Sequence, residues 1–161
     1  MIRAVRRVLV WLGVLWLAAV CSSAPSTFSL TGASVDPTYR CPGGANNSAY
    51  DLHATVNARN GTSKAVTISS VTAEMRLTAV RGSWLERVGD RYEAENVKFE
   101  PSSVGAGETA TLKVTIASAC TSGAYGSTVS NWGQYQVTMH ITTSSGAYSI
   151  SATNLHQILT A

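Results

Sequence analysis

Apolar and polar residues alternate with a period of two along much of this chain. The clearest stretch is Thr109–Ala117, whose apolar row consists of Leu112, Val114 and Ile116. A period of two places the apolar and polar rows on opposite faces of an extended backbone, as a half-buried antiparallel strand requires. The pattern therefore predicts a strand here, and this strand leads into Cys120.

Seven stretches carry a comparable pattern, and turn-forming residues such as Asn60-Gly61 and Ser144-Ser145-Gly146 separate them. A helix is the alternative over Thr72–Ala79, but Met75 and Leu77 lie two residues apart, which favours a strand. Seven strands with short connections predict an all-β, antiparallel, seven-stranded β-sandwich. The predicted strands are Thr27–Val35, Tyr50–Ala58, Lys64–Val80, Tyr92–Phe99, Thr109–Ala117, Gln134–Thr142 and Ala147–Ala152.

The apolar row of the Lys64–Val80 strand changes parity midway. Val66 and Ile68 lie on even positions, whereas the row from Val71 onward lies on odd positions. One extra residue in the strand accounts for this change, so we predict a β-bulge around Ser69-Ser70.

Two stretches, Val56–Val71 (VNARNGTSKAVTISSV) and Phe99–Ile116 (FEPSSVGAGETATLKVTI), resemble immunoglobulin-like and fibronectin-type-III-like modules of bacterial surface proteins. Such modules often have an Asn-Gly turn between two strands and a Pro…Gly-Glu turn before a strand. The resemblance implies an immunoglobulin-like sandwich and no functional residue. The cysteines do not follow the pattern of antibody domains, because Cys120 lies after its strand.

The N-terminus has the composition of an export signal. Met1–Arg7 is basic, and Val8–Val20 is an uncharged apolar run that is shorter than the roughly 20 residues of a spanning helix. We expect residues 1–24 to be a signal sequence, cleaved between about residues 20 and 26, and residues 25–161 to form a single domain. The protein is then secreted, periplasmic or extracellular.

An uncleaved membrane anchor is the alternative to a signal sequence, and for a cleaved signal two fates of the N-terminus remain open. Cys21 follows the apolar run directly, which resembles a bacterial lipoprotein signal with a lipidated cysteine, although Val20 stands where that pattern has a small residue. The alternative is ordinary cleavage within Cys21–Ala24, which releases a soluble protein. A membrane contact is expected only through a lipid on Cys21.

Removing the signal changes the charge of the protein. Nine Arg and Lys residues and nine Asp and Glu residues remain, so the mature domain is formally neutral. Nucleic-acid binding needs a positive field over one face, and a neutral chain does not supply it. We therefore exclude nucleic acid as a partner.

Two cysteines remain besides Cys21, and an oxidising compartment favours a disulfide between Cys41 and Cys120. Two free or metal-binding thiols are the alternative. A zinc site is not expected, because the chain has no CxxC or HxH spacing.

Connections between strands that run up and down alternate between the two ends of a sandwich. The short connections Asn60–Ser63, Glu100–Glu108 and Thr143–Gly146 then share one end, here called the short-loop pole. The other end, here called the long-loop pole, receives Asp36–Ala49, Arg81–Arg91 and Ser118–Gly133. Cys41 and Cys120 both lie at the long-loop pole, which makes their disulfide geometrically consistent.

Long loops on a rigid sandwich commonly carry recognition. The aromatic residues of the long-loop pole are candidate binding residues, namely Trp84, Trp132, Tyr39 and Tyr125. They suit a protein contact, or the stacking of sugar rings in a cell-envelope polysaccharide. The alternative is that Trp84 and Trp132 close the end of the core.

No catalytic motif, cofactor motif or metal motif appears in the sequence. His53 and His140 fall on outward positions of strands in opposite sheets, and the third histidine is His156. The carboxylates around Glu86 and Asp90 alternate with arginines, as in a solvated loop. We expect a noncatalytic exported interaction or structural module without a cofactor, which recognises protein through the long-loop pole. A carbohydrate-binding sandwich is the alternative.

Overall fold

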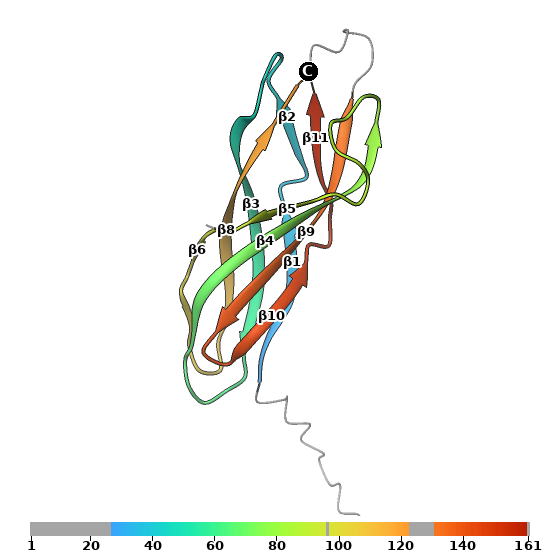
Figure 1. The fold of residues 1–161 in the computed structure, drawn as a ribbon. Helices are drawn as coiled ribbons and strands as arrows, with labels where there is room; N and C mark the ends of the chain where they lie inside the picture. The colour runs from blue at the N-terminus through green and yellow to red at the C-terminus, as the bar shows by residue number, and fades with distance from the viewer. Residues whose placement is uncertain (1–26, 96, 123–130, 161) are drawn as a thin grey trace, which may run out of the picture.

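Two β-sheets pack face to face and enclose one hydrophobic core in a computed structural model that describes residues 27–95, 97–122 and 131–160 (Figure 1). All regular structure in these ranges is β-strand. No helix within them has the length and apolar character to cross a membrane. The strands are β1 (Phe28–Val35), β2 (Thr38–Cys41), β3 (Ser48–Asn60), β4 (Val66–Arg81), β5 (Arg91–Ala94), β6 (Lys98–Glu100), β7 (Ser103–Val104), β8 (Thr109–Cys120), β9 (Trp132–Thr143), β10 (Gly146–Ser151) and β11 (His156–Thr160).

The smaller sheet has four strands in the order β1-β3-β8-β6. The larger has seven, in the order β2-β11-β9-β4-β5, with β10 also paired to β9 and β7 to β4. Every pair is antiparallel except β2 with β11. The predicted all-β sandwich with an immunoglobulin-like arrangement of two sheets is confirmed.

Each of the seven predicted strands is present, and one of them is divided. The predicted strand Tyr92–Phe99 becomes β5 and β6, which belong to different sheets. The chain crosses between the sheets after Ala94, whose side chain is buried. Three short strands, β2, β7 and β11, were not predicted, because their stretches are too short to show a clear alternation.

The alternation of apolar residues sets the register of the long strands. In β3 and β8, every second residue is buried between the sheets. The pairing of β4 with β9 shifts between Ile68 and Ser70, which confirms the predicted bulge. A second shift between Leu77 and Ala79 was not predicted. The hairpin of β9 and β10 around Ser144–Gly146 is confirmed.

The Asn60-Gly61 turn joins the two sheets instead of forming a hairpin within one. The side chain of Asn60 is fully buried, and its Nδ2 donates to the carbonyls of Lys64, Val104 and Gly105 at 2.8, 3.0 and 3.0 Å. Its Oδ1 accepts from the N–H of Thr62 at 3.0 Å. The amide of Asn60 thus links three segments at the short-loop pole.

We predict that Asn60→Asp lowers the free energy of unfolding by about 3 kcal/mol at pH 7, because a buried carboxylate cannot donate to the three carbonyls that the Asn60 amide bonds. Urea unfolding followed by tryptophan fluorescence measures the effect. The matched control is Asn46→Asp, the same change at an exposed position, which should alter stability little. An equal effect of both substitutions would contradict the role assigned to Asn60.

Candidate binding site at the long-loop pole

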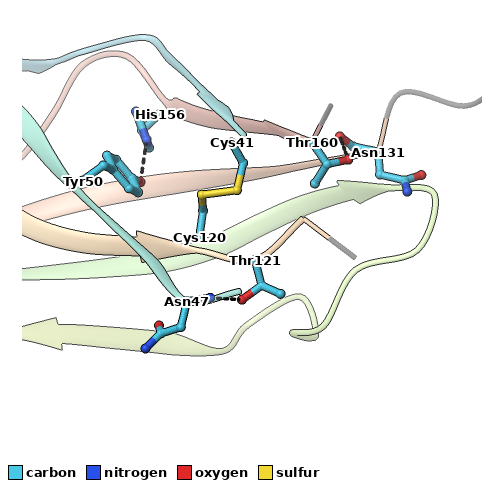
Figure 2. The surroundings of a disulfide bond; sticks show 8 residues. All are labelled: Cys41, Asn47, Tyr50, Cys120, Thr121, Asn131, His156 and Thr160. Carbon is cyan, nitrogen blue, oxygen red and sulfur yellow. Dashed lines mark hydrogen bonds between the residues drawn. A yellow bond between two sulfur atoms is a disulfide. The ribbon is translucent and has the colours of Figure 1, made fainter. Parts of the chain in front are cut away.

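A disulfide joins Cys41 at the end of β2 to Cys120 at the end of β8, with their Cα atoms 6.0 Å apart (Figure 2). Because β2 and β8 belong to different sheets, this bond ties the two layers together at the long-loop pole. The predicted pairing of Cys41 with Cys120 is confirmed. Both cysteines are buried.

The loop between β2 and β3 is held against the end of β8. The N–H of Ser122 donates to the carbonyl of Ala45 at 2.9 Å, and the N–H of Asn47 donates to Oγ1 of Thr121 at 3.0 Å (Figure 2). These contacts continue the β3–β8 pairing beyond Cys120. They hold this side of the pole in a defined position.

A cavity of about 150 Å³ opens beside the disulfide. It lies between the end of β8, the end of β11 and the segment that follows β4. Its walls are both polar and apolar. The lining residues are Asn47, Ser83, Trp84, Leu85, Glu86, Ala119, Cys120, Thr121, Tyr135, Ile158 and Thr160.

Trp84 forms a half-buried wall of this cavity. Its Nε1 donates to the hydroxyl of Tyr135 at 3.1 Å, and its ring lies against the backbone of Gly133. A Cβ added at Gly133 would stand 2.4 Å from Cε2 of the Trp84 ring. Glycine is therefore required at position 133 for the ring to occupy its place.

The hydroxyl of Tyr135 lies between Trp84 and Glu86 in a chain of two hydrogen bonds. Its hydroxyl donates to Oε2 of Glu86, while its ring packs in the core. Burial, and next the hydrogen bond to Glu86, raise the pKa of Tyr135 well above its ordinary value. The phenol therefore stays protonated and fixes the carboxylate of Glu86 at the mouth of the cavity.

A polar cluster of Tyr50 and His156 lies beside the disulfide in Figure 2. The ring of Tyr39 stacks on that of Tyr50, with centroids 3.8 Å apart, and the Tyr50 hydroxyl lies 3.0 Å from Nε2 of His156 (Figure 2). Nδ1 of His156 lies 2.7 Å from the carbonyl of Asp36. A carbonyl only accepts, so Nδ1 carries the proton and Nε2 accepts from Tyr50. Burial raises the pKa of Tyr50 to about 12 and lowers that of His156.

The four predicted binding residues have different positions. Trp84 lines the cavity, whereas Trp132, half-buried at the start of β9, does not. Tyr39 is half-buried on β2 and stacked in the cluster beside the disulfide. Tyr125 lies outside the described residues, as does Cys21. The structure therefore brings one of these side chains to the cavity.

Four large apolar side chains are exposed in the part of the chain that the structure describes, and all four lie between Val80 and Tyr92. Their exposed fractions are 38% for Val80, 68% for Leu85, 59% for Val88 and 43% for Tyr92. The sequence analysis did not single out Leu85 and Val88, because the many charges of this loop predict solvation. The one sequence feature that could have indicated their exposure is that two aliphatic residues lie in a loop, where burial cannot be expected.

The histidines do not gather into a catalytic or metal site. His53 on β3 and His140 on β9 face outward from opposite sheets, as predicted, and His156 is buried in the cluster described above. Within residues 27–95, 97–122 and 131–160, no three His, Cys, Asp or Glu side chains are grouped as a metal ion requires.

No protein-family model and no curated protein matches this chain. The solved structures that are similar include AggA, the major subunit of aggregative adherence fimbriae type I from Escherichia coli, with 10% identity and a TM-score of 0.33 over 83% of this chain and 95% of that one. They also include the CooA pilin subunit from enterotoxigenic Escherichia coli (10%, TM-score 0.29, 81% of this chain and 98% of that one) and the PapD-like domain 7 of human CEP192 (11%, TM-score 0.27, 93% and 95%). Similarities at this level carry no argument about family or function.

We predict that the stability of the protein falls as the pH drops below about 6.5. Burial lowers the pKa of His156 in the folded protein below the ordinary value of 6.5, so the unfolded chain takes up a proton at a higher pH than the folded protein does. Between these two pKa values, the free energy of unfolding falls by up to about 1.4 kcal/mol for each unit by which the pH drops. Urea unfolding between pH 7.5 and pH 5, values chosen around the ordinary pKa of histidine, measures the slope. This slope should be reduced in His156→Gln and retained in the exposed control His140→Gln; equal slopes in all three proteins would refute the assignment.

Proposed function

We propose that this protein is an exported, noncatalytic interaction module that binds a partner protein through its long-loop pole. The observation that carries the proposal is the concentration of exposed apolar side chains in Val80–Tyr92, beside a cavity. Exposed apolar surface that is gathered in one place is typical of interaction sites. The buried disulfide suits an oxidising compartment, which supports export.

The pole has the properties of a preorganised binding surface. The disulfide fixes the end of β8, and the chain of hydrogen bonds from Trp84 through Tyr135 to Glu86 fixes the segment opposite. A partner would therefore meet side chains that are already in place, which reduces the entropy lost on binding.

The tryptophans favour a protein partner over a polysaccharide. A sugar-binding platform needs aromatic faces that are open to solvent, whereas Trp84 and Trp132 are both half-buried. The exposed large apolar side chains of Val80–Tyr92 are aliphatic, apart from Tyr92. Aliphatic residues suit the apolar centre of a protein interface and do not stack on sugar rings.

Site-specific photo-crosslinking in the source cells tests this proposal. A photoreactive amino acid replaces Leu85 or Val88 at the long-loop pole, and Ser63 or Ala65 at the short-loop pole as matched exposed controls. We expect a discrete protein adduct from the first pair and none from the second. Mass spectrometry of the adduct then identifies the partner.

The double variant Leu85→Glu/Val88→Glu should reduce complex formation with that partner by at least about tenfold, since it replaces the apolar contacts with charge. The control Ser63→Glu/Ala65→Glu adds the same charge at the opposite end and should leave the complex intact. Adducts only from the short-loop pole, or equal effects of the two double variants, would refute the proposal.

A further inference from the structure

On the side away from β3, only part of β8 is paired with a neighbouring strand. Near its middle, Lys113 and Thr115 pair with β6 across one edge, and the pairing ends at Thr115. In an antiparallel sheet, alternate residues direct both their N–H and C=O groups to the same neighbouring strand. Thr115, Ala117, Ala119 and Thr121 therefore direct theirs away from β3.

Two hydrogen bonds confirm this alternation beyond the end of β6. The carbonyl of Ala117 accepts from the Tyr92 hydroxyl at 3.2 Å, so it faces the β6 side. The N–H of Ser122 donates to Ala45 at 2.9 Å, so the even positions still face the β3 side. Ala119 thus presents its N–H and C=O at an edge where, among the described residues, no strand pairs with it.

The free edge at Ala119 borders the cavity. Ala119, Cys120 and Thr121 form one wall of the cavity, and Trp84 and Leu85 form part of the opposite wall. Side chains that lie opposite each other on neighbouring strands point to the same face of the sheet. A residue placed beside Cys120, which faces the interior, would therefore direct its side chain toward the cavity.

The size of the cavity limits what can enter it. A cavity of about 150 Å³ holds a group about the size of benzene, which corresponds to one Leu or Phe side chain. Trp84, Leu85 and Ile158 supply its apolar walls. At the lower end of the free edge, the Tyr92 hydroxyl already occupies the carbonyl of Ala117, so an added strand must be short.

The opposite edge of the same sheet is not available in this way. There, the upper part of β1 is closed by the segment before β11. The carbonyl of Ala33 accepts from the N–H of Thr153 at 2.9 Å, and both backbone groups of Val35 bond to the side chain of Asn154. The upper end of β1 is thus covered, whereas β8 at Ala119 is not.

We propose that the end of β8 at Ala119 binds a short extended segment of a partner protein, which adds to the sheet as an antiparallel strand and places one Leu-sized or Phe-sized side chain in the adjoining cavity. An antiparallel direction matches the pairing of every strand in this sheet. Strand addition gives affinity through the backbone and specificity through a side-chain pocket. This inference rests on the proposed function, since it names the chemistry of the partner at the same pole.

Peptide titrations followed by amide chemical shifts test the inference. The probe is the capped peptide Lys-Thr-Thr-Leu-Thr-Thr-Lys, with versions that carry Phe or Asp in place of Leu. We expect saturable shifts at Ala119, Thr121 and Ser83–Glu86 with the Leu and Phe peptides. The Asp peptide should bind at least about tenfold more weakly, because its carboxylate cannot enter an apolar cavity.

Backbone N-methylation distinguishes strand addition from simple apolar contact. If the central Leu faces the cavity, the N–H groups of the two flanking Thr residues point at β8 and that of Leu points away. N-methylation of the flanking Thr residues should weaken binding at least about tenfold, whereas N-methylation of Leu should have little effect. Ala119→Pro removes the N–H at the edge and should also weaken binding. The control Ala119→Val retains this N–H and should leave binding little changed.

The results separate this inference from the proposed function. Absence of saturable shifts with the Leu and Phe peptides, or equal weakening by the two N-methylation patterns, overturns strand addition. If the crosslinked partner binds Ala119→Pro normally but not Leu85→Glu/Val88→Glu, the pole still recognises a protein and only strand addition is wrong. If neither variant affects the partner, both proposals fail.

Discussion

The packing of two sheets through alternate residues of β3, β4, β8 and β9 is the constraint on which the rest of the structure depends. Leu52, Met75, Ile116 and Met139 are among the fully buried side chains of this core, one from each of these strands. A core built in this way makes the long strands rigid and gathers the connections at two ends. The short-loop pole is closed by the buried amide of Asn60. The long-loop pole is tied by the disulfide.

The period-two alternation was sufficient to predict the long strands and the bulge near Ser69-Ser70, because each long strand has one buried face. The pairing of Cys41 with Cys120 followed from the number of cysteines and an oxidising compartment, and the alternation of the poles was consistent with it. The division of Tyr92–Phe99 between two sheets could not be predicted, since a crossing strand keeps its alternation while it changes partners. Likewise, β11 could not be predicted, because a short strand with the buried polar residue His156 shows no clear apolar row.

The candidate site could be predicted only in outline. The loops of the long-loop pole were identified, and Trp84 does line the cavity. The remaining lining depends on pairings that no local pattern contains, such as the position of Gly133 beneath the ring of Trp84. The exposure of Leu85 and Val88 also could not be deduced, because a hydrophobic residue in a loop is buried or exposed according to tertiary contacts alone.

The crossing of the chain from β5 to β6 connects the fold with the candidate site. Because β6 ends its pairing at Thr115 and β5 belongs to the other sheet, β8 runs on toward the disulfide paired with β3 on one side and, among the described residues, with no strand on the other. A sheet edge of this kind invites unwanted association unless it is covered. Here Tyr92 covers the carbonyl of Ala117, and the disulfide ties the end of β8 to β2 of the other sheet. The same two features that hold this end of the sandwich thus border the short segment of backbone at Ala119, which lines the cavity.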